Sequence, residues 1–132
     1  MEYVLVTNND RCRDAFQENF RVEFSPDWTY HDVLIHTRDL VHQGYRLTTH
    51  PMAGSLKPNQ TPYKSILLAP DTLKSDSLMD DVMLLEKCIE NHDKFMKNHE
   101  LFHWSDKIKE DFKTVDLSLI QGAANNAIIA RM

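Results

Sequence analysis

Short apolar runs alternate with helical patterns over the first 70 residues, and this order restricts the fold more than any other feature of the chain. The strand-like runs occupy residues 3–6, 21–24, 46–49 and 65–69. Helical patterns over residues 10–18 and 29–43 separate the first three runs. The order strand, helix, strand, helix, strand favours an α/β fold with a small, mostly parallel sheet of about four strands flanked by helices.

The pattern over residues 29–43 is the clearest helix of this half. Its apolar positions recur every three or four residues and form one stripe: Tyr30, Val33, Leu34, Thr37, Leu40 and Val41. Thr29 followed by Asp32 resembles a capping box, in which each side chain bonds the other residue's backbone N–H. Gly44 suits the position just past the helix, where a positive φ costs glycine little.

The second half of the chain predicts two longer C-terminal helices. In the first, over residues 77–100, the buried seam consists of Leu78, Val82, Leu85, Ile89, His92, Met96 and His99. A break at residues 104–106 precedes the second. We therefore expect a single α/β domain over residues 1–132, with a sheet-forming half (1–70) and a helical half (77–130). Small residues near the end of the second helix (Ala123, Ala124 and Ala127) permit close helix contact, within the chain or in a homodimer.

Residues 49–65 form a segment unlike the rest of the chain, with three of the five prolines, a glycine, a histidine and two lysines. A long loop inside a compact domain is uncommon and is usually functional or disordered. The prolines stiffen this loop, and stiffness lowers the cost of ordering it around a ligand. We therefore predict that the loop recognises a small anionic ligand or a partner.

The net charge of −5 argues against a nucleic-acid-binding protein, because phosphate backbones are bound by clustered Lys and Arg. No apolar run approaches the roughly 20 residues of a membrane span. Cys12 and Cys88 form no CxxC pair and imply no disulfide framework. These features predict a cytoplasmic protein that contacts neither membrane nor nucleic acid.

Ligands of open α/β sheets usually bind beyond the carboxyl ends of the strands. Thr7, Asn8 and Asn9 follow the first strand, and residues 48–50 follow the third, so the two groups should meet if these strands are parallel neighbours. His50 is the candidate catalytic acid or base, since imidazole titrates near neutrality; the alternative is a structural histidine that bonds a loop carbonyl. The predicted ligand-binding residues are Thr7, Asn8, Asn9, Gly54, Ser55, Lys57, Asn59, Thr61, Tyr63 and Lys64.

Several familiar kinds of site are excluded because the sequence lacks their motifs. The chain has no phosphate-binding G-x-x-x-x-G-K-[ST] loop, no dinucleotide fingerprint and no G-x-S-x-G elbow. His99 and His103 are four residues apart, a spacing that metals use, but no H-E-x-x-H motif is present. We therefore predict neither a metal nor a cofactor, and the roles of these histidines and of His92 stay open.

Two segments resemble the GrdX family, small proteins encoded with the glycine reductase genes of anaerobic, amino-acid-fermenting bacteria. They are Thr7-Asn8-Asn9 and the run from Asp39 to Ser65, which contains His-Pro-Met-Ala-Gly-Ser-Leu-Lys-Pro-Asn-Gln-Thr-Pro-Tyr. The resemblance spans roughly residues 3–69. It implies an accessory role around a glycine, sarcosine or betaine reductase complex and assigns no catalytic residue. The matching positions are Asn8, Asn9, His50, Pro51, Gly54, Ser55, Lys57, Pro58, Asn59, Thr61, Pro62, Tyr63 and Lys64.

Two kinds of function follow from these observations. The first is an accessory or ligand-binding protein that uses residues 49–65 to hold a small anion or a component of the reductase complex. The alternative is a small enzyme acting on a phosphorylated or carboxylated metabolite, with His50 as acid or base. The absence of a recognised catalytic motif favours the first.

Overall fold

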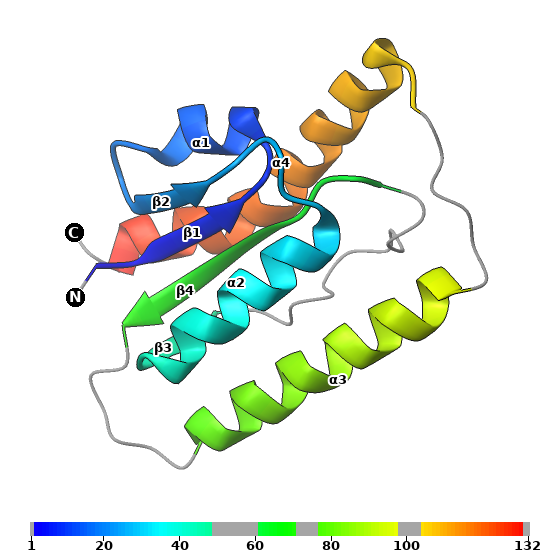
Figure 1. The fold of residues 1–132 in the computed structure, drawn as a ribbon. Helices are drawn as coiled ribbons and strands as arrows, with labels where there is room; N and C mark the ends of the chain where they lie inside the picture. Colours follow the sequence, from blue (N-terminus) through cyan, green and yellow to red (C-terminus); the bar gives the residue numbers. More distant parts are fainter. Residues whose placement is uncertain (1, 49–60, 71–76, 98–103, 131–132) are drawn as a thin grey trace.

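The computed structural model describes residues 2–48, 61–70, 77–97 and 104–130. The elements are β1 (Val4–Thr7), α1 (Asp10–Phe16), β2 (Arg21–Phe24), α2 (Tyr30–His42), β3 (Tyr45–Leu47), β4 (Ser65–Pro70), α3 (Ser77–Lys97) and α4 (Asp106–Ala130). The strands form one sheet with helices on both faces (Figure 1). The predicted α/β class is confirmed.

The strand order is β2-β1-β4-β3, with β1 parallel to β2 and β4 antiparallel to both of its neighbours. The sheet is therefore mixed, and the prediction of a mostly parallel sheet was wrong. A parallel neighbour requires a crossover, usually a helix, whereas the sequence between β3 and β4 carries prolines instead. Consequently β4 runs back and lies between β1 and β3, which are not the neighbours that we expected.

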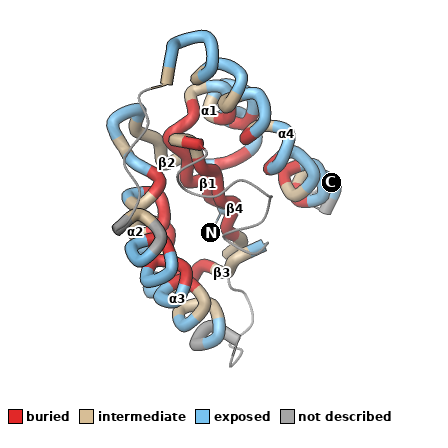
Figure 2. The backbone as a smooth tube through the Cα atoms, turned by 90° about the vertical axis from the view of Figure 1, so that its right-hand side faces the viewer, coloured by how far each residue is buried: buried red, intermediate tan, exposed pale blue. Residues whose placement is uncertain are grey.

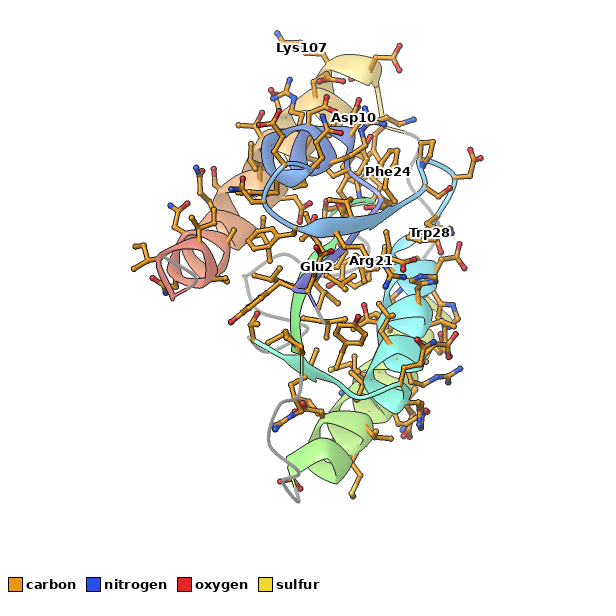
Figure 3. All side chains as sticks on the ribbon, turned by 90° about the vertical axis from the view of Figure 1, so that its left-hand side faces the viewer. Glu2, Asp10, Arg21, Phe24, Trp28 and Lys107 are labelled. Carbon is orange, nitrogen blue, oxygen red and sulfur yellow. The ribbon has the colours of Figure 1, made fainter. Side chains whose placement is uncertain are left out.

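Helices α2 and α3 cover one face of the sheet, and α1 and α4 cover the other (Figures 1 and 2). Side chains alternate across β1, so that Val4 and Val6 pack with α2 and α3, while Leu5 packs with α1 and α4. Ile66 and Leu67 of β4 divide between the same two clusters. The central strands are therefore buried on both faces, whereas β2 lies at the sheet edge with Arg21 and Phe24 at its two ends (Figure 3).

The local signals predicted for α2 are all present. The Thr29 backbone N–H donates to Asp32 Oδ2 at 2.9 Å, and the Asp32 N–H donates to Thr29 Oγ1 at 3.1 Å, which completes the capping box. All six residues of the predicted apolar stripe are buried. Gly44 has a φ of 107°, as expected for the residue that follows the helix end.

The prediction of two C-terminal helices is confirmed in part: α3 covers Ser77–Lys97 of the predicted 77–100, and α4 begins at Asp106, at the end of the predicted break. The residues that join them, 98–103, lie outside the described ranges. Ala124 and Ala127 of α4 are buried against the sheet, so they allow close packing within the chain. In the described part of the chain, no helix combines the length and apolar character that a membrane span needs.

Candidate functional site

Asn8, directly after β1, joins three segments of the chain. Its side-chain amide donates to the carbonyl oxygens of Trp28, at 2.9 Å, and Pro62, at 2.8 Å. Its Oδ1 accepts the backbone N–H of Lys64 at 2.9 Å. The side chain is 4% exposed, so these bonds replace water and fix the end of the 49–65 segment to the tip of β1. We call this arrangement the Asn8 joint.

Asn9 has an architectural position next to it. Its Oδ1 accepts the Arg11 N–H at 3.0 Å and caps α1. Its Nδ2 donates to the Lys113 carbonyl at 2.9 Å and to Asp116 Oδ2 at 3.1 Å, both on α4. The residue is fully buried, and its bonds connect the start of α1 to α4.

A buried carboxylate lies at the centre of the polar groups on this side of the sheet. Asp116 Oδ2 accepts the Ser65 hydroxyl at 2.7 Å, and the Thr7 and Ser65 hydroxyl oxygens are also 2.7 Å apart. The strand register places these two residues opposite each other. Cys12 Sγ lies 3.6 Å from the same carboxylate oxygen. Together with Asn9, these four residues form what we call the Asp116 cluster.

The thiol of this cluster is chemically quiet. Burial, reinforced by the negative charge of Asp116, raises the pKa of Cys12 to about 12. The thiolate is the nucleophilic form of cysteine, so Cys12 is inert at neutral pH. The Asp116 cluster has the properties of a hydrogen-bonded core rather than of a reactive centre.

Lys64 belongs to a different environment, on the side of the sheet covered by α2 and α3. The residue is only 8% exposed, and its Nζ lies 5.9 Å from the ring centroid of Tyr30. Burial lowers the pKa of this ammonium, against the attraction of Asp116. Burial also raises the pKa of the Tyr30 hydroxyl and of the Cys88 thiol.

His92 extends this group along the contact between α2 and α3. Its ring stacks on Tyr30, with centroids 5.6 Å apart, and lies 5.4 Å from the ring of His31. The residue is 8% exposed, and burial lowers its pKa. We call Tyr30, Lys64, Cys88 and His92 the Lys64 cluster; all four side chains are titratable, and burial shifts the pKa of each.

Thr61 and Tyr63 occupy the remaining described positions of the predicted loop. Thr61 is buried, and its Oγ1 accepts the Tyr63 N–H at 3.1 Å, a short turn that stiffens the path into Lys64. The Tyr63 ring lies 5.7 Å from Lys113 Nζ, which forms ion pairs with Asp10 at 3.0 Å and Glu110 at 3.1 Å. Burial raises the pKa of the Tyr63 hydroxyl.

The structure thus brings together Thr7, Asn8, Asn9, Thr61, Tyr63 and Lys64 at one end of the sheet. The other predicted site residues (His50, Gly54, Ser55, Lys57 and Asn59), and His99 and His103, lie outside the described residues. Sequence reasoning missed Asp116 and Tyr30. A carboxylate four residues before Ile120 on the buried face of α4 was the available signal for Asp116, because a charge at such a position requires polar partners.

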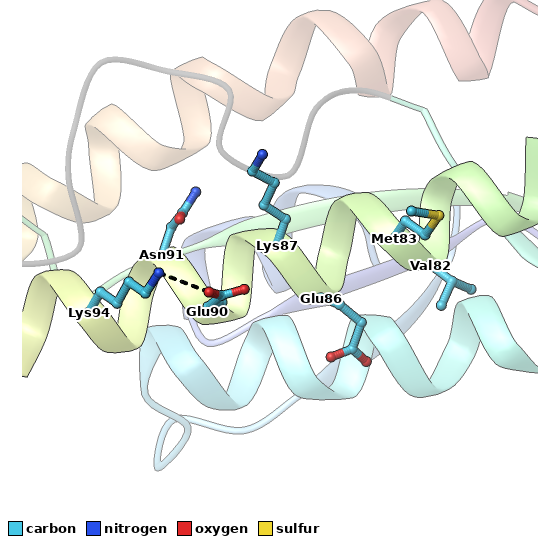
Figure 4. A pocket seen from close by; sticks show the side chains of 7 residues that line it. All are labelled: Val82, Met83, Glu86, Lys87, Glu90, Asn91 and Lys94. Atoms are coloured by element: carbon cyan, nitrogen blue, oxygen red, sulfur yellow. Dashed lines mark ion pairs between the residues drawn. The ribbon is translucent and has the colours of Figure 1, made fainter.

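A surface pocket of about 540 Å³ lies elsewhere, along α3 (Figure 4). Its lining mixes two lysines with two glutamates, and Lys94 pairs with Glu90 at 2.9 Å. The lining residues are Val82, Met83, Glu86, Lys87, Glu90, Asn91 and Lys94. It contains none of the predicted site residues, and its balanced charges select no class of ligand. Within the described ranges, no three His, Cys, Asp or Glu side chains are grouped so as to hold a metal.

Comparison with known proteins identifies the family of the chain. A family model described as GrdX-like protein matches residues 4–125. The chain belongs to the GrdX-like family. The GrdX-like match continues through α3 and most of α4, beyond the segments that carry the resemblance in the sequence. Neither the curated proteins nor the solved structures contain a match to the chain.

Proposed function

We propose that this GrdX-like protein is an accessory, ligand-binding protein of the glycine reductase system, and that residues 49–65 recognise a small anion or a partner. Two findings support the proposal. The family name connects the chain with glycine reductase genes. The described end of the segment is fixed to the sheet by the Asn8 joint, so the segment has a defined base.

The observation that carries the proposal is the burial of Lys64 at that base. An ammonium group in a low-dielectric environment attracts an anion more strongly than it does in water. The lowered pKa indicates that burial outweighs the attraction of Asp116, so a second negative charge beside Nζ would stabilise the charged form. Carboxylate and phosphate groups are the anions that lysine binds in proteins.

In this proposal the remaining predicted residues complete the site. Lys57 adds a second positive charge, Gly54 and Ser55 offer backbone N–H donors, and His50 donates a hydrogen bond. A phosphate-bearing or carboxylate-bearing metabolite is the corresponding ligand class. Asn8 and Asn9 then position the site without touching the ligand, because their side chains are occupied by the bonds described above.

Calorimetric titration with inorganic phosphate and with acetate tests the proposal. Lys64→Met, which keeps an apolar stem and removes the charge, should weaken anion binding at least tenfold. Lys107→Met is the matched control, since Lys107 is exposed on α4 and should be neutral to binding. Absence of heat with both anions, or equal affinity in the Lys64→Met variant, would contradict an anion site at Lys64.

Recognition of a partner protein requires a separate measurement. The immobilised wild-type chain should retain purified reductase components, and the immobilised Lys57→Ala variant should not. Retention of the components by the wild type and by Lys57→Ala alike would separate partner binding from this segment. Failure of both chains to retain any component would remove the reductase partner from the proposal.

A further inference from the structure

The side of α4 that faces away from the sheet carries an apolar stripe. Five large apolar side chains are exposed among the described residues, and four belong to α4: Ile108 (42%), Val115 (41%), Leu119 (50%) and Ile129 (66%). Val115 follows Ile108 by seven residues and precedes Leu119 by four, so these three lie on one side of the helix. The opposite side packs on the sheet through Ile120, Ala124 and Ala127. Hence α4 has a second apolar face that the described chain does not cover.

Gly122 continues this stripe, seven residues after Val115. Glycine weakens a helix interior relative to alanine, and the described part of the chain gives no reason for a glycine here. Its φ is not positive, and a Cβ added at this position would meet no atom of the described residues within 4 Å. A glycine on an open helix face is explained when another backbone or side chain approaches closely from outside.

We propose that the outward face of α4 pairs, antiparallel, with the same face of a second copy of this chain. Ile108, Val115 and Gly122 are evenly spaced by seven residues. A two-fold axis at Val115 therefore places Ile108 of each copy over Gly122 of the other, a large side chain into a gap. Leu119 then reaches the region of Phe112, which packs edge-on against Trp104 at 4.8 Å.

The charge pattern selects this partner and this direction. The charged residues of α4 are in its first half, where Lys107, Glu110 and Asp111 are exposed, and its second half is uncharged from Leu117 to Ala130. Antiparallel pairing sets each charged half against the neutral half of the other copy and opposes the two helix dipoles. Parallel pairing would instead bring Asp111 of one copy near Asp111 of the other, so that two negative charges would face each other.

The size of the stripe sets the expected strength of the pair. From Ile108 to Gly122 it extends about 21 Å along the helix. A single helix pair of this length buries less than the roughly 800 Å² per partner of a standard interface. The dimer should therefore be reversible, with a dissociation constant on the order of micromolar. The first turn of α4, marked by Lys107, projects past α1 (Figures 1 and 3), and the exposed fractions given above show that the described residues leave this face accessible.

Sedimentation equilibrium of the full chain tests the pairing. The wild type should approach twice the 15.4 kDa of one chain as its concentration rises through the micromolar range. Leu119→Glu should remain monomeric, while Met83→Glu, at an exposed apolar position on α3, should dimerise as the wild type does. A wild type that stays monomeric at hundreds of micromolar, or a Leu119→Glu variant that still dimerises, would overturn the proposal.

Two further variants test the register. Gly122→Leu fills the gap, so it should weaken association at least tenfold while circular dichroism shows the helix content retained; undiminished association would overturn the pairing of Ile108 with Gly122. Val115→Cys, at the two-fold axis, should form a disulfide-linked dimer under mild oxidation. Ile108→Cys should not, because its two copies would lie about 21 Å apart along the helix. Preferential cross-linking of Ile108→Cys would overturn the antiparallel arrangement. The native Cys12 and Cys88 are buried and do not confuse the assay.

Discussion

The two faces of the sheet use buried polar groups in opposite ways. On the side of α1 and α4, the Asp116 cluster is a closed set of short hydrogen bonds that joins β1, β4, α1 and α4. On the side of α2 and α3, the Lys64 cluster holds a cation against the ring of Tyr30, which in turn stacks on the buried His92, and burial shifts the pKa of all three groups. Both lie at the same end of the sheet. The comparison shows that polar residues at a strand end do not by themselves identify a binding site. The hydrogen-bond partners of each polar group are needed to distinguish a structural role from a role in ligand binding.

Loss of the Asn8 joint should have the largest effect on stability. Asn8→Ala removes three hydrogen bonds and leaves a backbone N–H and two carbonyl oxygens without their partner, which should cost about 3 kcal/mol of unfolding free energy. Urea denaturation measures this loss. Asn125→Ala, exposed on α4, is the control and should change little. A loss below about 1 kcal/mol for Asn8→Ala would show that the joint is not structural.

Within the Asp116 cluster, Ser65→Ala should cost about 1 to 2 kcal/mol, because the hydroxyl connects Thr7 with the carboxylate. The same denaturation assay applies. Ser118→Ala is the matched exposed serine, whose hydroxyl donates to the Thr114 carbonyl oxygen of its own helix, and it should be nearly neutral. Equal effects from both serines would remove the distinction between the cluster and the surface.

Lys64→Met should instead leave the unfolding free energy within about 1 kcal/mol of the wild type, because loss of the ammonium contact with the Tyr30 ring is offset by removal of the desolvation cost of the charge. Combined with the calorimetric titration, this variant sharpens the comparison. A residue that serves a site is dispensable for folding, whereas a residue that serves the architecture is not. A loss above about 3 kcal/mol would move Lys64 to the architectural side.

The smallest effect concerns pH. Burial holds the pKa of His92 below its ordinary value of 6.5 in the folded chain, so the unfolded chain binds the proton more readily. Stability should therefore fall as the pH decreases from about 6.5 toward the folded pKa, with the neighbouring His31, Asp93 and Tyr30 facing the ring. His92→Phe should flatten this part of the stability profile. An unchanged slope in the His92→Phe variant would show that other titratable groups cause this pH dependence.

The local features of the fold were predictable because their causes are local. The capping box at Thr29, the stripe of α2 and the positive φ of Gly44 each depend on residues within a few positions of one another. The position of β4 in the sheet was not predictable, since it is decided by pairing between residues more than fifty positions apart. The family resemblance was also recognisable from its motif, and the family match confirms it.

The candidate site was predictable in part for the same reason. The position of Thr7, Asn8 and Asn9 at the end of β1 was predicted correctly, because polar residues that follow a short apolar run usually mark the end of a buried strand. The separation of Thr7 and Asn9, in the Asp116 cluster, from Asn8, in the Asn8 joint, could not be predicted, since it depends on the position of Asp116, more than a hundred residues after Asn9.

The Asn8 joint has a mechanical consequence. It attaches Pro62 and Lys64 to the first strand immediately before the chain enters β4, and β4 is hydrogen-bonded on both sides and in contact with α4. A load applied to the base of the 49–65 segment is therefore transmitted to the middle of the sheet rather than absorbed at the surface. Occupation of that segment should slow amide exchange in β4, and this slowing would report remotely on events at the loop.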